Sequence, residues 1–393
     1  MKNCNVDGRY YLDGQIKFPS KLWKTPTATE VPKLHVGDIK GYYLDSVDYR
    51  GKPTKIFAYL GVPKFSPDKT PVTKNSKLPA VVLVHGGSGT AFAEWVKVWN
   101  DRGYVAIAMD TFGHQPTLTS RRDNFDRDEN PFGGPDLAEL LSDFELPIEN
   151  QWAYQAVASV IVSNSFVRSI PVVDQSRVAL TGISYGSFLT CQTLLYDNRF
   201  VCAVPVYGSY ELRLGDTIFA NGLKPYPRKI ELWDNPKRVG KNDVPVLFVA
   251  GNIDPYFSVL GTTESCKLRP RSKMLIVHEY PHSHYHGSEY VPEIFDFIDG
   301  YCLGKSALPS VKNAPTAENP VAVFDLPNGN KITSATAYFT DFEILKETTV
   351  WQKKNCVIEG EKISVGDLDG ARYFYFEITD LFNRRITTSV VKK

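Results

Sequence analysis

From residue 78 to residue 304, uninterrupted apolar runs alternate with longer segments whose apolar residues recur at helical intervals. The apolar runs are PAVVLVHGG, YVAIAMD, VCAVPVYG, VPVLFVAG and KMLIVHEY, in that order along the chain. The segments with helical spacing include AFAEWVKVWNDRG, QWAYQAVASVIVSNSFVRSI and VPEIFDFIDGYCLG. Continuous apolar runs are typical of strands that are buried on both faces. The pattern therefore predicts an α/β fold, in which helices cover both faces of a mainly parallel, doubly wound sheet.

The pattern changes on either side of this region. Before it, the runs GYYLDSVDY and TKIFAYLGV flank Arg50 and Gly51, which predicts a hairpin. After it comes a stretch rich in proline, lysine and small residues, followed by short strand-like runs separated by turn signals. We therefore expect an N-terminal β extension (1–39), an α/β domain (40–304), a linker (305–320) and a small all-β domain (321–393).

The composition excludes some classes of protein. The 393 residues are 42% hydrophobic and 23% charged, with a net charge of +1, which gives no attraction to nucleic acid or to an anionic membrane. No segment approaches the roughly 20 apolar residues of a membrane span, and the N-terminal residues lack the apolar core of a signal peptide. We therefore expect a cytoplasmic protein, or a secreted one if its signal peptide is missing here, with no nucleic-acid or membrane partner. The six cysteines are scattered, as is typical of free thiols, and nothing in the sequence indicates the oligomeric state.

The pattern G-x-S-x-G occurs at Gly182-Ile183-Ser184-Tyr185-Gly186, between a strand-like run and a helix-like run. A tight turn from strand to helix leaves little room for side chains at the flanking positions, which favours glycine there. The same turn exposes the hydroxyl of the central residue above the sheet. Ser184 is therefore the candidate nucleophile, and the rest of the chain should supply a base, an acid and an oxyanion hole.

An acidic residue follows the next-to-last predicted strand of the sheet. Asp254 lies three residues after Gly251, where reactive groups gather beyond the carboxyl ends of parallel strands. Asp234 and Asp243 are alternatives, but both precede this strand. Asp254 is therefore the preferred partner for the base.

Three histidines follow the last strand, in PHSHYHG at His282, His284 and His286. We expect this strand to end near Tyr280, which places His282 too close to the strand to reach back over the serine. His286 precedes a glycine where the chain turns toward the next helix. His284 is therefore the preferred base. The alternative is a metal site, because H-x-H is a known zinc spacing, although no further acidic or thiol ligand is adjacent.

A glycine-rich loop, HGGSGTA, follows the first strand of the sheet. Backbone N–H groups in such a loop can stabilise an oxyanion, so we assign one donor to Gly87 and the other to Tyr185, the residue after the nucleophile. A phosphate-binding loop is the alternative, but the sequence lacks both G-K-[ST] and G-x-G-x-x-G. His85, on the same loop, is expected to brace the loop rather than to act as the base.

In the order serine, aspartate, histidine, these parts resemble the α/β-hydrolase superfamily over residues 40–304. The stretches FAEWVKVWNDRGYVAIAMDTFG, VALTGISYGSFLTCQTLLYDNRFVCAVPVYG and PHSH…PEIFDFID are similar to dienelactone hydrolase-like and acetylxylan esterase-like bacterial proteins, which often carry a small C-terminal β domain. Dienelactone hydrolase itself has a cysteine where this sequence has Ser184. The resemblance implies hydrolysis of carboxylic esters, including the deacetylation of glycans.

The sequence thus predicts a serine carboxylesterase that cleaves small acyl esters, acetyl esters in particular, on a small molecule or a glycan. It is expected to need no cofactor and no metal. Residues 114–150 and 209–243, rich in aromatic residues, are expected to wall the substrate cleft. One alternative is a serine peptidase of the prolyl-oligopeptidase type, although no propeller-sized segment precedes the first hairpin. The other is a non-enzymatic carbohydrate-binding protein that acts through its β domain.

Overall fold

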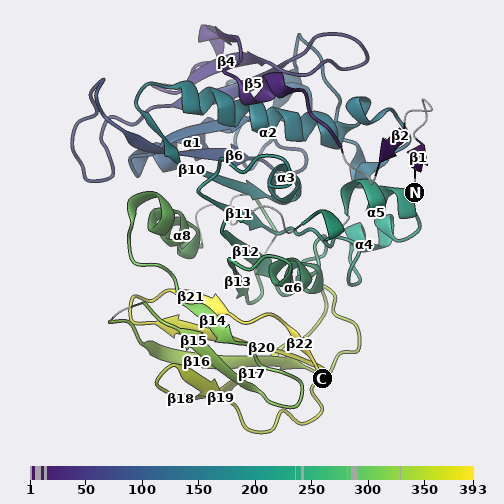
Figure 1. Ribbon diagram of the computed structural model, residues 1–393, viewed down its shortest axis with the longest axis vertical. Coiled ribbons are helices and arrows are strands. Elements are labelled where there is room, and N and C mark those ends of the chain that lie inside the picture. The colour runs from purple at the N-terminus through teal and green to yellow at the C-terminus, as the bar shows by residue number, and fades with distance from the viewer. Residues whose placement is uncertain are drawn as a thin grey trace.

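The computed structural model describes residues 2–4, 10–12, 16–234, 236–239, 243–280, 282–284, 291–327 and 329–393. Figure 1 shows an α/β body that carries a smaller β module at its lower end, with the C-terminus in that module. The predicted fold class is confirmed: a doubly wound sheet carries a C-terminal set of strands. Among the described residues, no helix is both long and apolar enough to cross a bilayer.

The parallel part of the central sheet has the strand order β7-β6-β10-β11-β12-β13. These strands are β6 (Leu78–Val84), β7 (Val105–Met109), β10 (Val173–Ile183), β11 (Cys202–Val206), β12 (Val246–Gly251) and β13 (Ser272–Val277). Every residue of β6, β7, β11 and β12 is buried, as the continuous apolar runs predict. Because the strands are parallel, their carboxyl ends meet at one edge of the sheet, and the loops that follow them lie together there.

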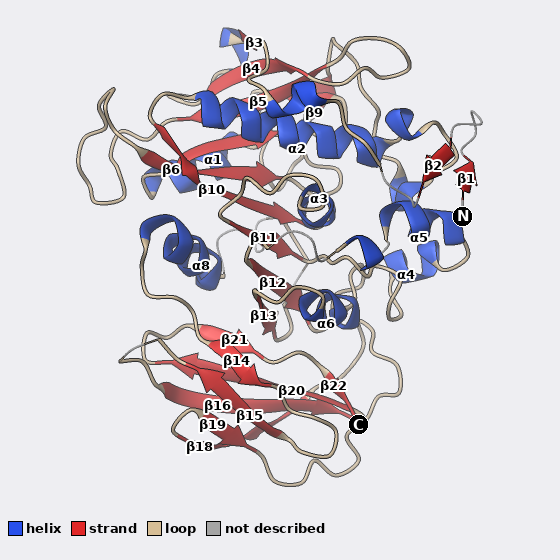
Figure 2. Cartoon of the chain, in the orientation of Figure 1, coloured by secondary structure: helices blue, strands red, loops and turns tan. Residues whose placement is uncertain are grey.

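Helices cover both faces of this sheet (Figure 2). The helices on these faces are α1 (Ala93–Asp101), α2 (Trp152–Ser169), α3 (Tyr185–Thr193), α6 (Val259–Lys267) and α8 (Pro292–Leu303), while α4 (Ile218–Leu223) and α5 (Pro227–Trp233) lie beside the sheet and contact each other. Helices α1 and α8 share one face, where the rings of Trp99 and Phe295 lie 5.0 Å apart. Helices α2 and α3 pack together on the other face, where Trp152 stacks on Phe188. Short 3-10 helices lie at Ser20–Trp23, Pro32–Leu34, Glu139–Leu141, Ile148–Asn150 and Pro236–Arg238.

Antiparallel strands extend the sheet beyond β7, in the order β5 (Lys55–Gly61), β4 (Lys40–Asp45) and β3 (Ala28–Glu30). The predicted hairpin is confirmed, since β4 pairs with β5 and the chain turns through Arg50 and Gly51, both with positive φ. Two small antiparallel pairs lie apart from this sheet: β1 (Lys2–Cys4) with β2 (Tyr10–Leu12), and β8 (His114–Pro116) with β9 (Arg127–Glu129).

The C-terminal strands form two sheets. One is a separate four-stranded sheet of β14 (Ser310–Asn313), β15 (Val321–Asp325), β19 (Lys362–Ser364) and β18 (Val357–Glu359). The other continues the central sheet through β21 (Arg385–Thr387), β20 (Tyr373–Asp380), β16 (Ile332–Thr340) and β17 (Gln352–Asn355), with β22 (Val391–Lys392) paired to β20. Strand β14 lies within the stretch expected to be a linker, and β3 joins the sheet from the expected N-terminal extension, so the domain boundaries stay a prediction.

Candidate active site

Ser184 lies at a sharp turn between β10 and α3, with φ 58° and ψ −121°. This region of backbone space is unfavourable for a residue with a side chain, so the turn must be held by its surroundings. The N–H of Ser184 donates to the carbonyl of Val206 at 2.8 Å, which ties the turn to the neighbouring strand. A Cβ on Gly186 would overlap the carbonyl oxygen of Val84, and one on Gly182 would overlap that of Gly186. The glycines of the G-x-S-x-G pattern are therefore required by close packing against β6 and within the turn.

A hydrogen-bonded chain runs from Ser184 through His282 to Asp254. His282 Nε2 lies 2.9 Å from Ser184 Oγ, and His282 Nδ1 lies 2.7 Å from Asp254 Oδ2. The other carboxylate oxygen of Asp254 accepts the N–H groups of Tyr256 and Phe257 at 2.7 and 2.9 Å, which fixes the carboxylate. This is the arrangement in which a histidine can take a proton from a serine while a carboxylate holds its tautomer.

Aromatic rings hold the His282 imidazole in place. The ring of Tyr207 lies 4.5 Å away, and that of Tyr256 lies 4.7 Å away. The ring of Phe257 is nearly parallel to the imidazole, at 5.9 Å and 7°. An imidazole enclosed in this way cannot rotate freely, so its two nitrogens stay aimed at the serine and the aspartate.

The geometry corrects the choice of His284 as the base. His284 Nε2 accepts the N–H of Gly86 at 2.7 Å, and its ring packs edge-on against Phe125 at 5.1 Å. The reason for the error is the end of the preceding strand. Strand β13 ends at Val277, not near Tyr280, and Glu279 turns the chain with φ 49°. His282 is therefore well past the strand and reaches back over the serine.

His284 instead supports the glycine-rich loop after β6. Loss of water around the ring, with smaller effects of nearby His282 and Arg122, lowers the pKa of His284 to about 4. At neutral pH its Nε2 is thus free of a proton and can accept the Gly86 N–H. His286 lies outside the described residues.

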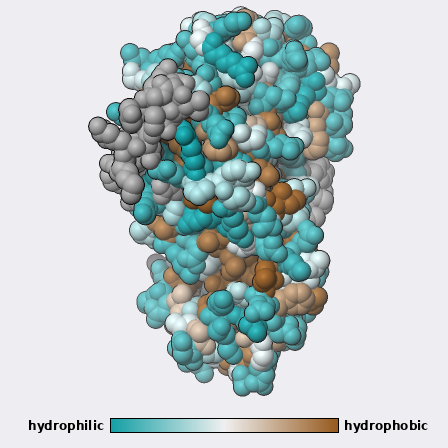
Figure 3. Space-filling view, turned by 90° about the vertical axis from the view of Figure 1, so that its right-hand side faces the viewer, coloured by the Kyte–Doolittle hydropathy of each residue, from teal (hydrophilic) through white to brown (hydrophobic). Residues whose placement is uncertain are grey.

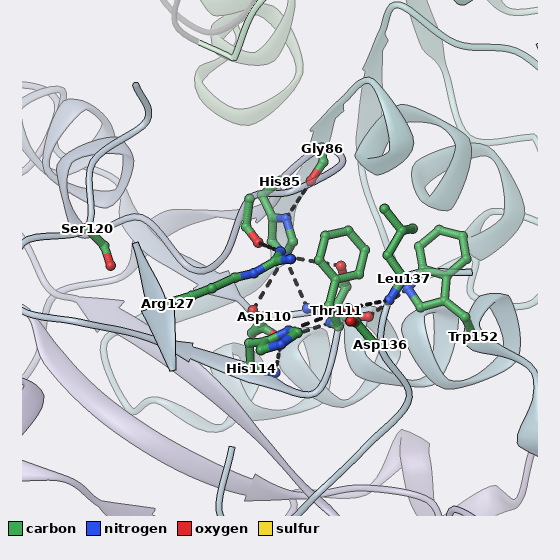
Figure 4. Close-up of polar contacts among 12 residues, drawn as sticks. His85, Gly86, Asp110, Thr111, His114, Ser120, Arg127, Asp136, Leu137 and Trp152 are labelled. Carbon is green, nitrogen blue, oxygen red and sulfur yellow. Dashed lines mark hydrogen bonds and ion pairs between the residues drawn. The ribbon is translucent and has the colours of Figure 1, made fainter. Parts of the chain in front are cut away.

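His85 braces the same loop from the inside (Figure 4). Its Nε2 accepts the N–H of Thr111 at 3.1 Å, so the ring proton is on Nδ1, which donates to the carbonyl of Gly86 at 2.8 Å. Burial lowers the pKa of His85 to about 3, which keeps the ring neutral. The peptide of Gly86 is therefore held at both ends, by His85 at its carbonyl and by His284 at its N–H.

The two expected oxyanion donors lie next to each other. A Cβ on Gly87 would come within 2.8 Å of the Tyr185 ring, so the loop runs directly beside the first turn of α3. Within the described part of the chain, neither Gly87 N–H nor Tyr185 N–H has a hydrogen-bond acceptor. Tyr185 is also the first residue of α3, where the partial positive charge of a helix N-terminus favours an anion. Their role as oxyanion donors stays a prediction.

The serine opens into a cleft of about 690 Å³. Its walls come from the turn at Ser184, the glycine-rich loop, His282 and His284, and both segments that were expected to wall it. The lining residues include Ser88, Arg122, Phe125, Leu137, Glu139, Leu140, Ile218, Phe219 and Tyr256. Most of these side chains are apolar, and Ile218 and Tyr256 are 48% and 40% exposed, as expected of residues at an entrance. The Tyr185 hydroxyl accepts the N–H of Leu140 at 3.0 Å, and this hydrogen bond links the turn at Ser184 to the wall of the cleft.

The alternative acids lie elsewhere. Asp234 is buried and accepts the N–H groups of Leu212 and Arg213, so its carboxylate is fully engaged in a structural role. Asp243 is exposed and pairs with Arg271 at 3.4 Å. Among the described residues, no group of three histidine, cysteine, aspartate or glutamate side chains is arranged to hold a metal ion.

Comparisons with known proteins agree with this architecture. The model of the prolyl oligopeptidase family matches residues 131–264, a stretch that contains Ser184 and Asp254. Among solved structures, an acetyl xylan esterase from Paenibacillus sp. R4 is 20% identical, with TM-score 0.52, over 71% of this chain and 91% of that one. Acetyl xylan esterase 1 from Thermoanaerobacterium sp. JW/SL YS485 is 17% identical, with TM-score 0.51, over 74% of this chain and 96% of that one. No curated protein sequence matches the chain.

At these identities the two solved structures establish the fold, while the family match is confined to residues 131–264. The resemblance seen in the sequence is thereby confirmed. The chain therefore has the fold of the α/β hydrolases, and its residues 131–264 match the prolyl oligopeptidase family, which indicates a serine hydrolase.

Proposed function

We propose that the protein is a serine carboxylesterase that removes small acyl groups, acetyl groups above all, from a small alcohol or a carbohydrate. The observation that carries the proposal is the hydrogen-bonded chain Ser184–His282–Asp254 at the base of an open, mainly apolar cleft. The family match and the fold support esterase or peptidase activity. Both acetyl xylan esterases align over more than nine-tenths of their length, which favours the ester among these two substrate classes.

The proposed reaction has two steps. Ser184 Oγ attacks the ester carbonyl while His282 Nε2 takes the hydroxyl proton, and the same nitrogen then returns that proton to the leaving alcohol. Water, activated by His282, next attacks the acyl-enzyme and releases the carboxylic acid. Asp254 keeps the proton of the neutral imidazole on Nδ1 and stabilises the imidazolium.

The N–H groups of Gly87 and Tyr185 are proposed to donate hydrogen bonds to the carbonyl oxygen as negative charge develops on it. Both donors are supplied by the backbone, so they need no reorganisation during the reaction. Nucleophile, base, acid and oxyanion donors all come from the chain, and the proposed reaction therefore needs no cofactor.

A second candidate is a serine peptidase, which the family match favours. The cleft carries two carboxylates, Asp123 and Glu139, that could bind the ammonium group of a peptide. An amine is a poorer leaving group than an alcohol and must be protonated before it departs, so an amide is harder to cleave than an ester. The two functions therefore differ in the substrates that turn over rather than in those that bind.

The test is a panel of p-nitrophenyl acetate, butyrate and octanoate beside acetylated xylose and aminoacyl p-nitroanilides. Ser184→Ala serves as the background for every substrate. The proposal predicts turnover of the acyl esters, fastest with the shortest chain, and release of acetate from the sugar. Turnover of the anilides alone would replace the esterase by the peptidase.

A further inference from the structure

The C-terminal module is bonded to the strand that leads to the His282 loop. Strand β21 pairs antiparallel with β13, at Thr387 opposite Met274. The buried Thr387 hydroxyl accepts the N–H of Ile276 at 3.0 Å and donates to the carbonyl of Met274 at 3.1 Å. In Figure 3, hydrophobic side chains gather at the waist of the molecule, between the body and this module. The joint therefore lies on the strand that leads into the loop with the proposed base, His282.

A second hydrophobic core fills this joint. It combines residues of the body with residues of the module: Ala250, Val259, Met274, Ile276, Leu345, Trp351, Tyr373, Tyr375 and Val390. Tyr375 is fully buried, stacks on Tyr338 at 5.1 Å and meets Trp351 edge-on at 5.2 Å. The hydroxyl of a buried tyrosine and the indole N–H of a buried tryptophan require hydrogen-bond partners, so these partners show which residues the aromatic cluster restrains.

Both polar tips converge on one residue of the body. Asn252, which is 3% exposed, accepts the indole N–H of Trp351 on its backbone carbonyl at 3.3 Å. Its side-chain nitrogen lies 3.3 Å from the hydroxyl of Tyr375 and 2.9 Å from Nδ1 of His278. Its side-chain oxygen accepts the N–H of Glu279 at 2.8 Å. Asn252 thus connects the module to two loops of the active site.

These loops carry the acid and the base. Asn252 lies two residues before Asp254, and Glu279 lies three residues before His282. Glu279 has φ 49°, a backbone conformation that a residue with a side chain keeps only when its surroundings hold it. The hydrogen bond from the Glu279 N–H to Asn252 is one such restraint, and the turn at Glu279 directs the chain toward His282.

We propose that the C-terminal module positions the Asp254 and His282 loops, with Asn252 as the positioning residue and with Tyr375 and Trp351 as its anchors. The inference rests on the proposed function, because it assigns the module a part in the Ser184–His282–Asp254 chemistry. Neither aromatic residue touches the reacting atoms. Each restrains a residue that fixes where the carboxylate and the imidazole stand.

Matched variants in the full chain test this inference. Tyr375→Phe removes only the hydroxyl that meets Asn252. Tyr373→Phe is the control, since it makes the same change two residues away on the same strand, where the hydroxyl donates to the carbonyl of Glu343 at 3.3 Å. Asn252→Leu keeps the approximate shape and removes the side-chain hydrogen bonds. For each variant, kcat and KM for p-nitrophenyl acetate are measured beside the thermal midpoint.

We expect kcat to fall about fivefold in Tyr375→Phe and about a hundredfold in Asn252→Leu, with KM within about twofold, because small misplacement of catalytic groups costs rate rather than binding. The control should keep the wild-type kcat. Labelling of Ser184 by a fluorophosphonate should slow in the same order. A role in stability alone predicts something else, namely a lower thermal midpoint with unchanged kcat in the remaining folded protein.

Wild-type kcat in both Tyr375→Phe and Asn252→Leu, or equal losses in Tyr375→Phe and the control, would overturn the inference. His282→Ala separates this failure from failure of the proposed function. If His282→Ala is inactive while the Asn252 variant is fully active, only the positioning role is wrong. If His282→Ala stays active, the proposed function fails and the inference falls with it.

Discussion

The buried histidine at the base of the glycine-rich loop makes stability depend on pH. His85 is 1% exposed, and the groups that face it are Thr111, Asp110, whose Oδ2 lies 4.0 Å from Nε2, and the side chains of His114, Arg127 and His284. Burial lowers its pKa from 6.5 to about 3. In the folded protein the neutral ring accepts the Thr111 N–H, which an imidazolium cannot do.

The sign and size of the effect follow from the two pKa values. Because the pKa is lower in the folded protein than in the unfolded chain, the unfolded chain binds a proton first as the pH falls below 6.5. Stability is therefore fully present above 6.5 and is lost as the pH falls toward 3. At a pH of about 4.5, two units below 6.5, the loss amounts to about 2.7 kcal/mol, at about 1.36 kcal/mol per unit.

The assay compares wild type with His85→Gln in urea unfolding, followed by tryptophan fluorescence, at pH values of about 7 and about 4.5. Glutamine can still accept the Thr111 N–H, but it does not titrate. The variant is expected to be less stable at neutral pH, and only the change between the two pH values is compared. That change should be smaller in the variant by about 2.7 kcal/mol. Equal losses of stability in both proteins would refute the reasoning.

Four further variants test the site. Gly186→Ala should fail to give soluble, active protein, because its Cβ would overlap the Val84 carbonyl; soluble protein with normal kcat would contradict this. His282→Gln should lower kcat by about 10⁴-fold or more, whereas His284→Gln should cost about tenfold, since glutamine can still accept the Gly86 N–H; the reverse order in a p-nitrophenyl acetate assay would restore His284 as the base. Asp254→Asn should lower kcat by about 10⁴-fold with KM nearly unchanged, because the amide favours the wrong tautomer of His282, and a change in KM alone would argue against this role.

Local sequence signals were sufficient to predict the parallel sheet and the sharp turn at Ser184. The buried strands appear as continuous apolar runs because parallel strands covered on both faces need apolar side chains at every position. The glycines around Ser184 are required by contacts within a few residues of the turn and with the adjacent strand. A five-residue pattern can therefore report them.

The choice among the histidines depended on a strand end that the apolar run does not reveal. KMLIVHEY continues through His278 to Tyr280 as a β-like sequence, yet the ladder stops at Val277. The side-chain oxygen of Asn252, which lies on another loop, accepts the N–H of Glu279 and thereby favours a turn over a longer strand. That interaction is non-local, so no pattern within the run could predict it.

The attachment of the C-terminal module was also beyond the sequence. Its link to β13 is the pairing of Thr387, in the short strand β21, with Met274. These two residues lie more than a hundred positions apart in the sequence. The strand-like runs predicted the β content of the module but not that it would continue the central sheet. Composition likewise gave no reason to expect a strand within residues 305–320.

The central claim is that Ser184 is a nucleophile activated by His282. It is tested most directly by reacting the intact protein with a fluorophosphonate and mapping the adduct by mass spectrometry of the proteolysed chain. The account predicts one adduct, on Ser184, that is absent from Ser184→Ala and forms far more slowly in His282→Gln. An adduct on another residue, persistent labelling of Ser184→Ala, or labelling of His282→Gln at the wild-type rate would contradict it.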